Sequence, residues 1–216
     1  MQKRDLGKLK TNNMGSYFRQ GLENWLKTID VKAHSVLDIG GSQNPIKGRT
    51  KSWEVNDFKI LDLPNPHEDK PQPDIVCDLN LAYLEEGRKE LEAGGDKTEG
   101  CDVAFCLEVM EYLYNPYQAV KNMACLLKSR GVLYISFPFL YPIHPPTGTD
   151  YLRYTKYGAC RLLEEAGFTI EKVVPRVPEN KGRILDFWVN DKYRFDKTES
   201  YDSLVETGCL IKAIKN

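Results

Sequence analysis

Short apolar runs, each with the length of a buried strand, recur along this chain and alternate with helical patterns. The runs lie at 35–39, 58–61, 75–77, 102–106, 132–137, 168–174 and 209–214. Amphipathic patterns at helical spacing lie at about 15–29, 81–93, 115–128 and 156–166. Near-continuous apolar runs are typical of parallel strands buried on both faces. The alternation therefore predicts an α/β chain with a mostly parallel sheet and helices on both of its faces.

The length of 216 residues fits one such domain, residues 1–216. A proline-rich stretch at 64–73 is expected to be a loop within it, because strand-like runs flank it closely. The segment at about 175–207 is polar with scattered aromatics, and its run Ile184–Val189 fits a short strand or a helix beside the site.

Composition excludes several classes of function. The 30 Lys and Arg residues nearly balance the 31 Asp and Glu residues, so no overall field favours nucleic acid. No apolar run reaches the length of a membrane span, and the N-terminus lacks the apolar centre of a signal peptide. We therefore expect a cytoplasmic protein that has no membrane partner, and the charge balance argues against a nucleic-acid partner without removing methylation of nucleic acid or protein as an alternative.

Six cysteines and three histidines give no metal-ligand spacing. No CxxC pair occurs among the cysteines, which stand at 77, 101, 106, 125, 160 and 209. Cys77, Cys106 and Cys125 fall within apolar segments. We expect reduced, mostly buried thiols and no metal site.

The segment Val36–Pro45 (VLDIGGSQNP) reads as a buried strand that enters a tight turn beside a ligand. Gly40 and Gly41 can adopt backbone angles closed to other residues, and they let a bulky ligand approach the main chain. Asp38 is placed to accept hydrogen bonds from a cation or a hydroxyl group. A plain turn is the alternative, since glycine-rich turns after strands are common.

Two further acids end the next two strands, and they strengthen the ligand interpretation. Asp62 lies 24 residues after Asp38, near the spacing at which an acid binds ribose hydroxyls in nucleotide-binding α/β folds. Asp78 ends the third strand, where it could hold the amine of adenine while Leu79 packs against the ring. A single strand-ending Asp is more often a cap or turn former, but three in succession indicate one crevice at the carboxyl ends of the strands.

Together these motifs resemble class I S-adenosylmethionine (SAM)-dependent methyltransferases over residues 30–174 and the last strand. Val36–Pro45 is similar to the first motif of that family, and 102–116 (DVAFCLEVMEYLYNP) resembles the motif of its fourth strand. Residues 142–155, with His144-Pro145 and the segment DYLRYT, resemble the H-P…D-Y-W-R-F-T signature of one subgroup. The resemblance implies a Rossmann-like, doubly wound sheet of seven strands with an antiparallel last strand.

The resemblance also implies SAM as the cofactor and a methyl transfer as the reaction. It implies cofactor contacts at Asp38, Gly40, Gly41, Asp62, Leu63, Asp78, Leu79, Cys106 and Leu107. Two residues depart from the family pattern. Ser42 stands where a glycine is usual, so the turn must accommodate a side chain. Tyr112 replaces a histidine, and its ordinary pKa near 10 makes it a poor base.

The acceptor side of the site is predicted from the loop after the fifth strand. His144 is the candidate catalytic base, because its ordinary pKa near 6.5 suits proton transfer; the alternative is that it only packs to hold the loop. Residues expected to bind the acceptor are Glu108, Glu111, Tyr112, Tyr151 and Arg153. The two glutamates could instead complement a helix dipole, and Arg153 could instead pair with Asp150 or Glu111.

The favoured function is methyl transfer to a small-molecule or sugar-containing acceptor, with O-methylation slightly preferred because of His144. A non-catalytic SAM-binding or scaffold domain of the same fold is the main alternative. An NAD-binding oxidoreductase is less favoured, since Gly40-Gly41-Ser42 lacks the G-x-G-x-x-G spacing.

Overall fold

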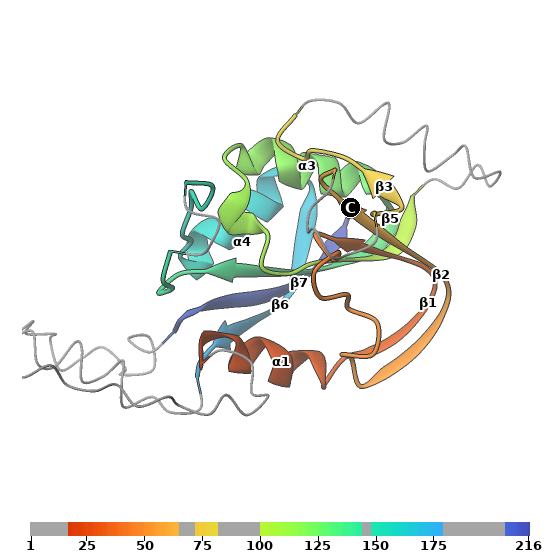
Figure 1. Ribbon diagram of the computed structural model, residues 1–216, viewed down its shortest axis with the longest axis horizontal. Helices are drawn as coiled ribbons and strands as arrows, with labels where there is room; N and C mark the ends of the chain where they lie inside the picture. The colour runs from red at the N-terminus through yellow and green to blue at the C-terminus, as the bar shows by residue number, and fades with distance from the viewer. Residues whose placement is uncertain (1–16, 65–71, 82–99, 144–147, 179–205) are drawn as a thin grey trace, which may run out of the picture.

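A seven-stranded sheet forms the centre of the protein in a computed structural model, which describes residues 17–64, 72–81, 100–143, 148–178 and 206–216 (Figure 1). Its strands are β1 (Asp30–Ile39), β2 (Ser52–Asp62), β3 (Ile75–Val76), β4 (Cys101–Cys106), β5 (Leu127–Pro138), β6 (Phe168–Arg176) and β7 (Gly208–Lys215). The strand order is β3-β2-β1-β4-β5-β7-β6. Strands β1 to β5 pair in parallel, and β7 is antiparallel to both neighbours. The predicted fold, including its antiparallel last strand, is confirmed.

Helices cover both faces of this sheet, as the alternation of patterns predicts. The helical elements are η1 (Tyr17–Arg19), α1 (Gln20–Leu26), η2 (Met110–Tyr112), α3 (Pro116–Leu126) and α4 (Lys156–Glu165). Figure 1 shows α1 on one face of the sheet and both α3 and α4 on the other. Successive residues of a strand point to opposite faces. In β1, Val36 accordingly packs in the cluster with α1, whereas Leu37 packs in the cluster with α3 and α4.

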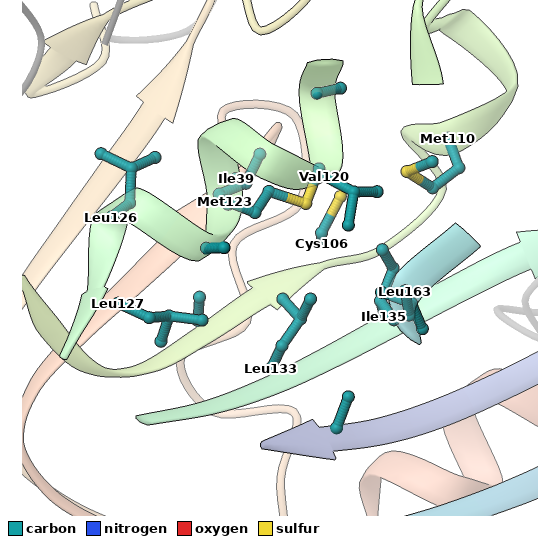
Figure 2. Packing of buried hydrophobic residues seen from close by; sticks show 14 of the residues in the cluster. Ile39, Cys106, Met110, Val120, Met123, Leu126, Leu127, Leu133, Ile135 and Leu163 are labelled. Atoms are coloured by element: carbon teal, nitrogen blue, oxygen red, sulfur yellow. The ribbon is translucent and has the colours of Figure 1, made fainter. Parts of the chain in front are cut away.

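The larger core cluster lies beneath α3. Figure 2 shows Val120, Met123 and Leu126 of α3 above Leu133 and Ile135 of β5. These side chains are at most 1% exposed. Burial of this kind is the main favourable term in folding, and here it holds α3 and η2 close to the carboxyl end of β4.

Strands β1, β2 and β5 begin at least five residues earlier than the apolar runs predict. Strand β1 begins at Asp30 and β2 at Ser52, and these two residues face each other at the start of the parallel ladder. Strand β4 joins β1 only from Val36 onward. The first part of the β1–β2 ribbon therefore extends beyond β4. Its exposed polar residues interrupt the apolar pattern, so the apolar runs do not predict it.

Helix ends follow the expected local chemistry. Thr155 caps α4 by accepting a hydrogen bond from the Gly158 N–H at 3.2 Å, and Gly167 adopts a left-handed φ of +93° after the helix. Both are confirmed. The first helix is shorter than the predicted 15–29, because Thr28 bonds to the Trp25 carbonyl and β1 begins directly afterwards. The predicted helix at 81–93 and the run Ile184–Val189 lie outside the described residues, except for Leu81.

The six cysteines are free, but they are less buried than the sequence indicates. Cys101, Cys106 and Cys209 are buried, whereas Cys77 and Cys160 are half-buried. Cys125 is exposed although it falls within an apolar segment, because its neighbours Ala124 and Leu126 occupy the buried side of α3. Across the described ranges, none of the helices has the length and apolar character that a membrane crossing requires.

Candidate functional site

A cavity of about 430 Å³ opens where the carboxyl ends of β1, β2, β3 and β4 meet. This is the edge at which doubly wound sheets bind their ligands, and the volume suits a small molecule. Four chain segments at or after strand ends contribute to the lining. They are Ile39, Gly40 and Gln43 after β1; Leu61–Leu63 at the end of β2; Cys77–Asn80 after β3; and Glu108, Val109 and Tyr112–Tyr114 after β4. Arg19, Thr149 and Tyr151 complete the lining.

The turn after β1 depends on Gly40. Its φ is +72°, and its N–H donates a hydrogen bond of 2.7 Å to the Leu61 carbonyl of β2. A Cβ atom at this position would lie 2.3 Å from Cγ2 of Val109. Both the backbone angle and the close approach therefore require glycine, as the sequence indicates.

Asp38 and Gly41 shape this turn from outside the cavity lining. The buried Asp38 carboxylate accepts a 2.7 Å hydrogen bond from the Ile46 N–H, and a Cβ atom on Gly41 would lie 2.3 Å from its Oδ2. Burial raises the pKa of Asp38 to about 7, against the lowering effect of the Ile46 bond and of Arg49. Ser42, which is also buried, fits into the turn, although its hydroxyl has no hydrogen-bond partner among the described residues.

Asp62 joins the ends of β1 and β2 at the cavity wall. Its Oδ2 accepts a hydrogen bond from the Ser42 N–H at 3.2 Å, and its Oδ1 accepts one from the Leu63 N–H at 2.8 Å. A carboxylate has about four acceptor sites, so these two bonds leave capacity for a ligand hydroxyl. The predicted cofactor residue Leu63 lies beside it in the lining.

Asp78 and Leu79 line the cavity from the end of β3. The Oδ1 atom of Asp78 accepts bonds from both the backbone and the side-chain amide of Asn80, each at 2.9 Å. The buried Asn122 of α3 donates to the carbonyls of Leu79 and Leu81 at 2.9 and 2.8 Å. Local sequence reasoning missed Asn80 and Asn122; the only signal for Asn122 is an amide on the apolar face of a predicted helix.

Cys106 and Leu107, two of the predicted cofactor contacts, are not part of the lining. Cys106 is fully buried in the cluster beneath α3, and Leu107 packs against the cluster on the α1 side. The chain reaches the cavity only at the next residue, Glu108.

Glu108 follows β4 with a left-handed φ of +60°, which is unusual for a residue other than glycine. Its carboxylate is held by Arg176 of β6 through two contacts, at 2.5 and 2.9 Å. The Ser136 hydroxyl at 3.1 Å and the Tyr141 hydroxyl at 3.3 Å also donate to it. Burial would raise the pKa of Glu108, but Arg176 outweighs it and holds the pKa below its ordinary value. Arg176 was absent from the predicted site.

Glu111 lies behind the cavity wall and is only 1% exposed. Its Oε2 has no hydrogen-bond partner in the part of the chain that the structure describes. Burial and the nearby Glu108 raise its pKa to about 8. Its backbone carbonyl accepts bonds from the N–H groups of Tyr151 and Leu152, at 2.7 and 3.2 Å, so this residue supports the loop before α4.

We expect Glu111→Gln to flatten the pH dependence of stability. The folded-state pKa of about 8 lies above the ordinary 4.5, so folded protein keeps a proton that the unfolded chain has lost. The stabilisation that this proton gives to the folded state is complete below the pKa of the unfolded chain. It is lost as the pH rises towards 8, and the free energy of unfolding then falls by at most about 1.4 kcal/mol per pH unit. Urea unfolding at pH values between these limits measures it. The exposed Glu164→Gln is the control, and an unchanged slope in Glu111→Gln would contradict the assignment.

Arg153 acts on the loop rather than on the cavity. Its guanidinium pairs with both oxygens of Asp150 and donates to the carbonyls of Tyr141, Pro142 and Leu152, at 3.3, 3.0 and 2.8 Å. It does not line the cavity, so the geometry favours the structural alternative, in which it pairs with Asp150.

The predicted acceptor residues Tyr112 and Tyr151 do line the cavity. Burial raises the pKa of Tyr112 well above its ordinary value, so it is no base at neutral pH. The Tyr151 ring packs edge-on against that of Tyr114, with 5.9 Å between the ring centroids. The predicted base His144 lies outside the described residues. Within those residues, no cluster of three His, Cys, Asp or Glu side chains could hold a metal ion.

Known proteins share this architecture at low sequence identity. No protein-family model matches the chain. A structure of a putative methyltransferase in complex with the Haloferax volcanii activator Trm112 superposes with a TM-score of 0.52 and 13% identity, over 92% of this chain and 88% of that one. An S-adenosylmethionine-dependent methyltransferase from Mesorhizobium loti superposes with a TM-score of 0.50 and 13% identity, over 92% of this chain and 98% of that one. The mitomycin 7-O-methyltransferase MmcR superposes with a TM-score of 0.51 and 14% identity, over 94% of this chain and 55% of that one.

These likenesses, together with the strand order, define the fold. The chain has the Rossmann-like α/β fold of SAM-dependent methyltransferases, with a mostly parallel seven-stranded sheet. At such identities the comparison extends to the fold alone, and the chemistry must be argued from the residues at the cavity.

Proposed function

We propose that the protein binds SAM in this cavity and transfers its methyl group to a small molecule. The observation that carries the proposal is that three strand-end segments converge on one cavity. Gly40, Asp62 and the pair Asp78-Leu79 all line it, in a fold that methyltransferases use. Polar groups at intervals along an otherwise apolar crevice suit an adenosine, which has a hydroxylated ribose and a flat ring.

The residues of the chain divide the work of holding this cofactor. Asp62 would accept hydrogen bonds from the ribose hydroxyls, and Asp78 would accept one from the adenine amine. Leu63 and Leu79 offer apolar surface for the ring, and the turn at Gly40 brings the main chain close to the methionine part. Asp38 and Gly41 support this turn from behind, and Cys106 and Leu107 support the end of β4.

Bound SAM supplies an activated methyl group, and the protein would position the acceptor in line with it and exclude water. Tyr112 and Tyr151 would form the acceptor wall, and Glu111 and Arg153 would fix the segments that carry them. His144 remains the proposed base for a hydroxyl acceptor, in which case O-methylation is favoured. It would take the hydroxyl proton as the O–C bond forms and the bond from the methyl group to sulfur breaks, with S-adenosylhomocysteine as the leaving product.

Isothermal titration calorimetry with SAM and with S-adenosylhomocysteine tests the proposal. We expect both to bind with one site per chain, and absence of binding to both would refute it. Binding without turnover across a broad panel of hydroxyl and amine acceptors would instead favour a non-catalytic SAM-binding domain. A His144→Ala variant with full turnover on a confirmed acceptor would exclude the proposed base.

A further inference from the structure

Arg176 is a fully buried cation at the end of β6, 0% exposed, and it touches the cavity wall from behind. Its guanidinium binds both oxygens of Glu108, as described above. Its Nε atom donates a third bond, of 2.6 Å, to the carbonyl of Phe18 in η1. One side chain thus connects the end of β4 to the turn that precedes α1.

Neighbouring groups hold Arg176 itself in place. The buried Thr207 donates to the Arg176 carbonyl from its N–H at 2.8 Å and from its hydroxyl at 2.9 Å. The guanidinium carbon lies 5.1 Å from the centre of the Tyr141 ring, and that ring contacts Phe18 at 5.2 Å between centroids. A buried charge is tolerated only when it is paired and hydrogen-bonded, and these contacts meet the requirement.

The turn that Arg176 holds contributes to the cavity. Arg19 follows Phe18 directly and belongs to the lining, as does Glu108. Helix α1 approaches the end of β6 closely at Gly21, where a Cβ atom would lie 3.1 Å from backbone atoms of Val177. Loss of the Phe18 bond would therefore release a part of the wall that carries a positive charge.

We propose that Arg176 is a positioning residue of the ligand cavity: it fixes the Glu108 carboxylate at one wall and fastens the Phe18–Arg19 turn as another. Two walls that come from distant parts of the chain then depend on one guanidinium. Because the turn lines the cavity, occupation of the cavity and docking of the turn stabilise each other. The ligand side of this inference rests on the proposed function, since the ligand is taken to be SAM or its product.

An Arg176→Lys substitution separates charge from geometry. Lysine keeps a cation near Glu108, but its single ammonium lacks the planar fork that reaches both carboxylate oxygens and the Phe18 carbonyl together. We expect the variant to fold and to bind S-adenosylhomocysteine about tenfold more weakly or worse, because at least one charge-assisted bond is lost. The matched control is Glu171→Gln, which removes a surface ion pair between β6 and β7 far from these contacts.

The slowing of hydrogen exchange at residues 17–26 by the ligand supplies a readout that a purely structural role would not move. In the parent protein we expect S-adenosylhomocysteine to slow exchange in this segment. In Arg176→Lys we expect faster exchange that the ligand no longer slows. Ligand affinity within twofold of the parent, together with parental exchange in this segment, would overturn the proposal.

Two further outcomes remain informative. If the parent binds neither SAM nor S-adenosylhomocysteine, the proposed function fails. Faster exchange of residues 17–26 in ligand-free Arg176→Lys would still support the fastening of the turn by Arg176. Unchanged exchange in that variant would refute the fastening. If Arg176→Lys does not fold, the charge-free pair Glu108→Gln with Arg176→Gln replaces it, because two neutral amides avoid an unpaired buried charge. The affinity for S-adenosylhomocysteine and the hydrogen exchange of residues 17–26 in this double variant then test the proposal.

Discussion

Gly40→Ala should abolish measurable binding of SAM and lower the free energy of unfolding by about 2 to 5 kcal/mol, the combined cost of a left-handed residue and of overpacking. The backbone at Gly40 has a φ of +72°, which an L-residue with a side chain adopts only under strain. A Cβ atom would also lie 2.3 Å from Cγ2 of Val109, which itself lines the cavity. The turn would have to move, and the cavity wall would move with it.

Two variants separate these causes. Gly48 has a similar φ of +86°, yet a Cβ atom there would meet nothing within 4 Å, so Gly48→Ala measures the backbone cost alone. In Gly40→Ala with Val109→Ala the clash is relieved, and part of the stability should return. Urea unfolding and calorimetry with SAM give both quantities. If Gly40→Ala and Gly48→Ala cost the same and both bind SAM normally, the close contact with Val109 has no role.

The strand-end acids were predictable because strands of a parallel sheet end at one edge. Each of Asp62 and Asp78 follows a short apolar run, and the crevice rule for such sheets brings those ends together. The structure puts both in the cavity lining. Asp38 shows the limit of the same rule. It also stands near a strand end, but alternation along β1 turns its side chain toward the Ile46 N–H and away from the lining.

Arg176 could not be predicted in the same way, because its partners are distant in the chain. Glu108 and Phe18 are 68 and 158 residues away from it. The local signal is only an arginine that interrupts the run Val173–Pro178 (VVPRVP), and such an arginine is more often at the surface. Antiparallel pairing of β6 with β7 ends at Arg176 and Gly208, which brings the guanidinium to the cavity edge. That register depends on tertiary pairing and not on any short pattern.

The proposed acceptor loop is a third case, in which the sequence left one partner of Arg153 open as an alternative and gave no signal for the others. Arg153 and Asp150 are three residues apart, so their pairing was one of the alternatives open from sequence. The additional bonds from Arg153 to the Tyr141 and Pro142 carbonyls depend on how the loop after β5 folds back. Polar residues of a motif-like segment can therefore hold a loop in shape without lining the cavity.

Asp62→Ala should weaken the binding of SAM and of S-adenosylhomocysteine about 10- to 100-fold, the loss expected for charge-assisted hydrogen bonds to a ligand hydroxyl. The carboxylate lies at the cavity wall, and two backbone N–H groups orient it without exhausting its acceptor sites. Asp62→Asn keeps the shape but removes the charge, so we expect an intermediate loss. Calorimetry with each ligand measures the affinities.

Asp57→Ala is the matched control, because Asp57 lies on the same strand, is exposed, and is far along β2 from the cavity edge. It should leave both affinities unchanged. Since Asp62 also joins the β1 turn to β2, the free energy of unfolding of each variant must be measured beside its affinity. A fall in stability with unchanged affinity would reduce Asp62 to a turn former. A fall in affinity for both ligands, larger in Ala than in Asn, would assign Asp62 to a part of the ligand that SAM and its product share, as the proposed ribose contact requires.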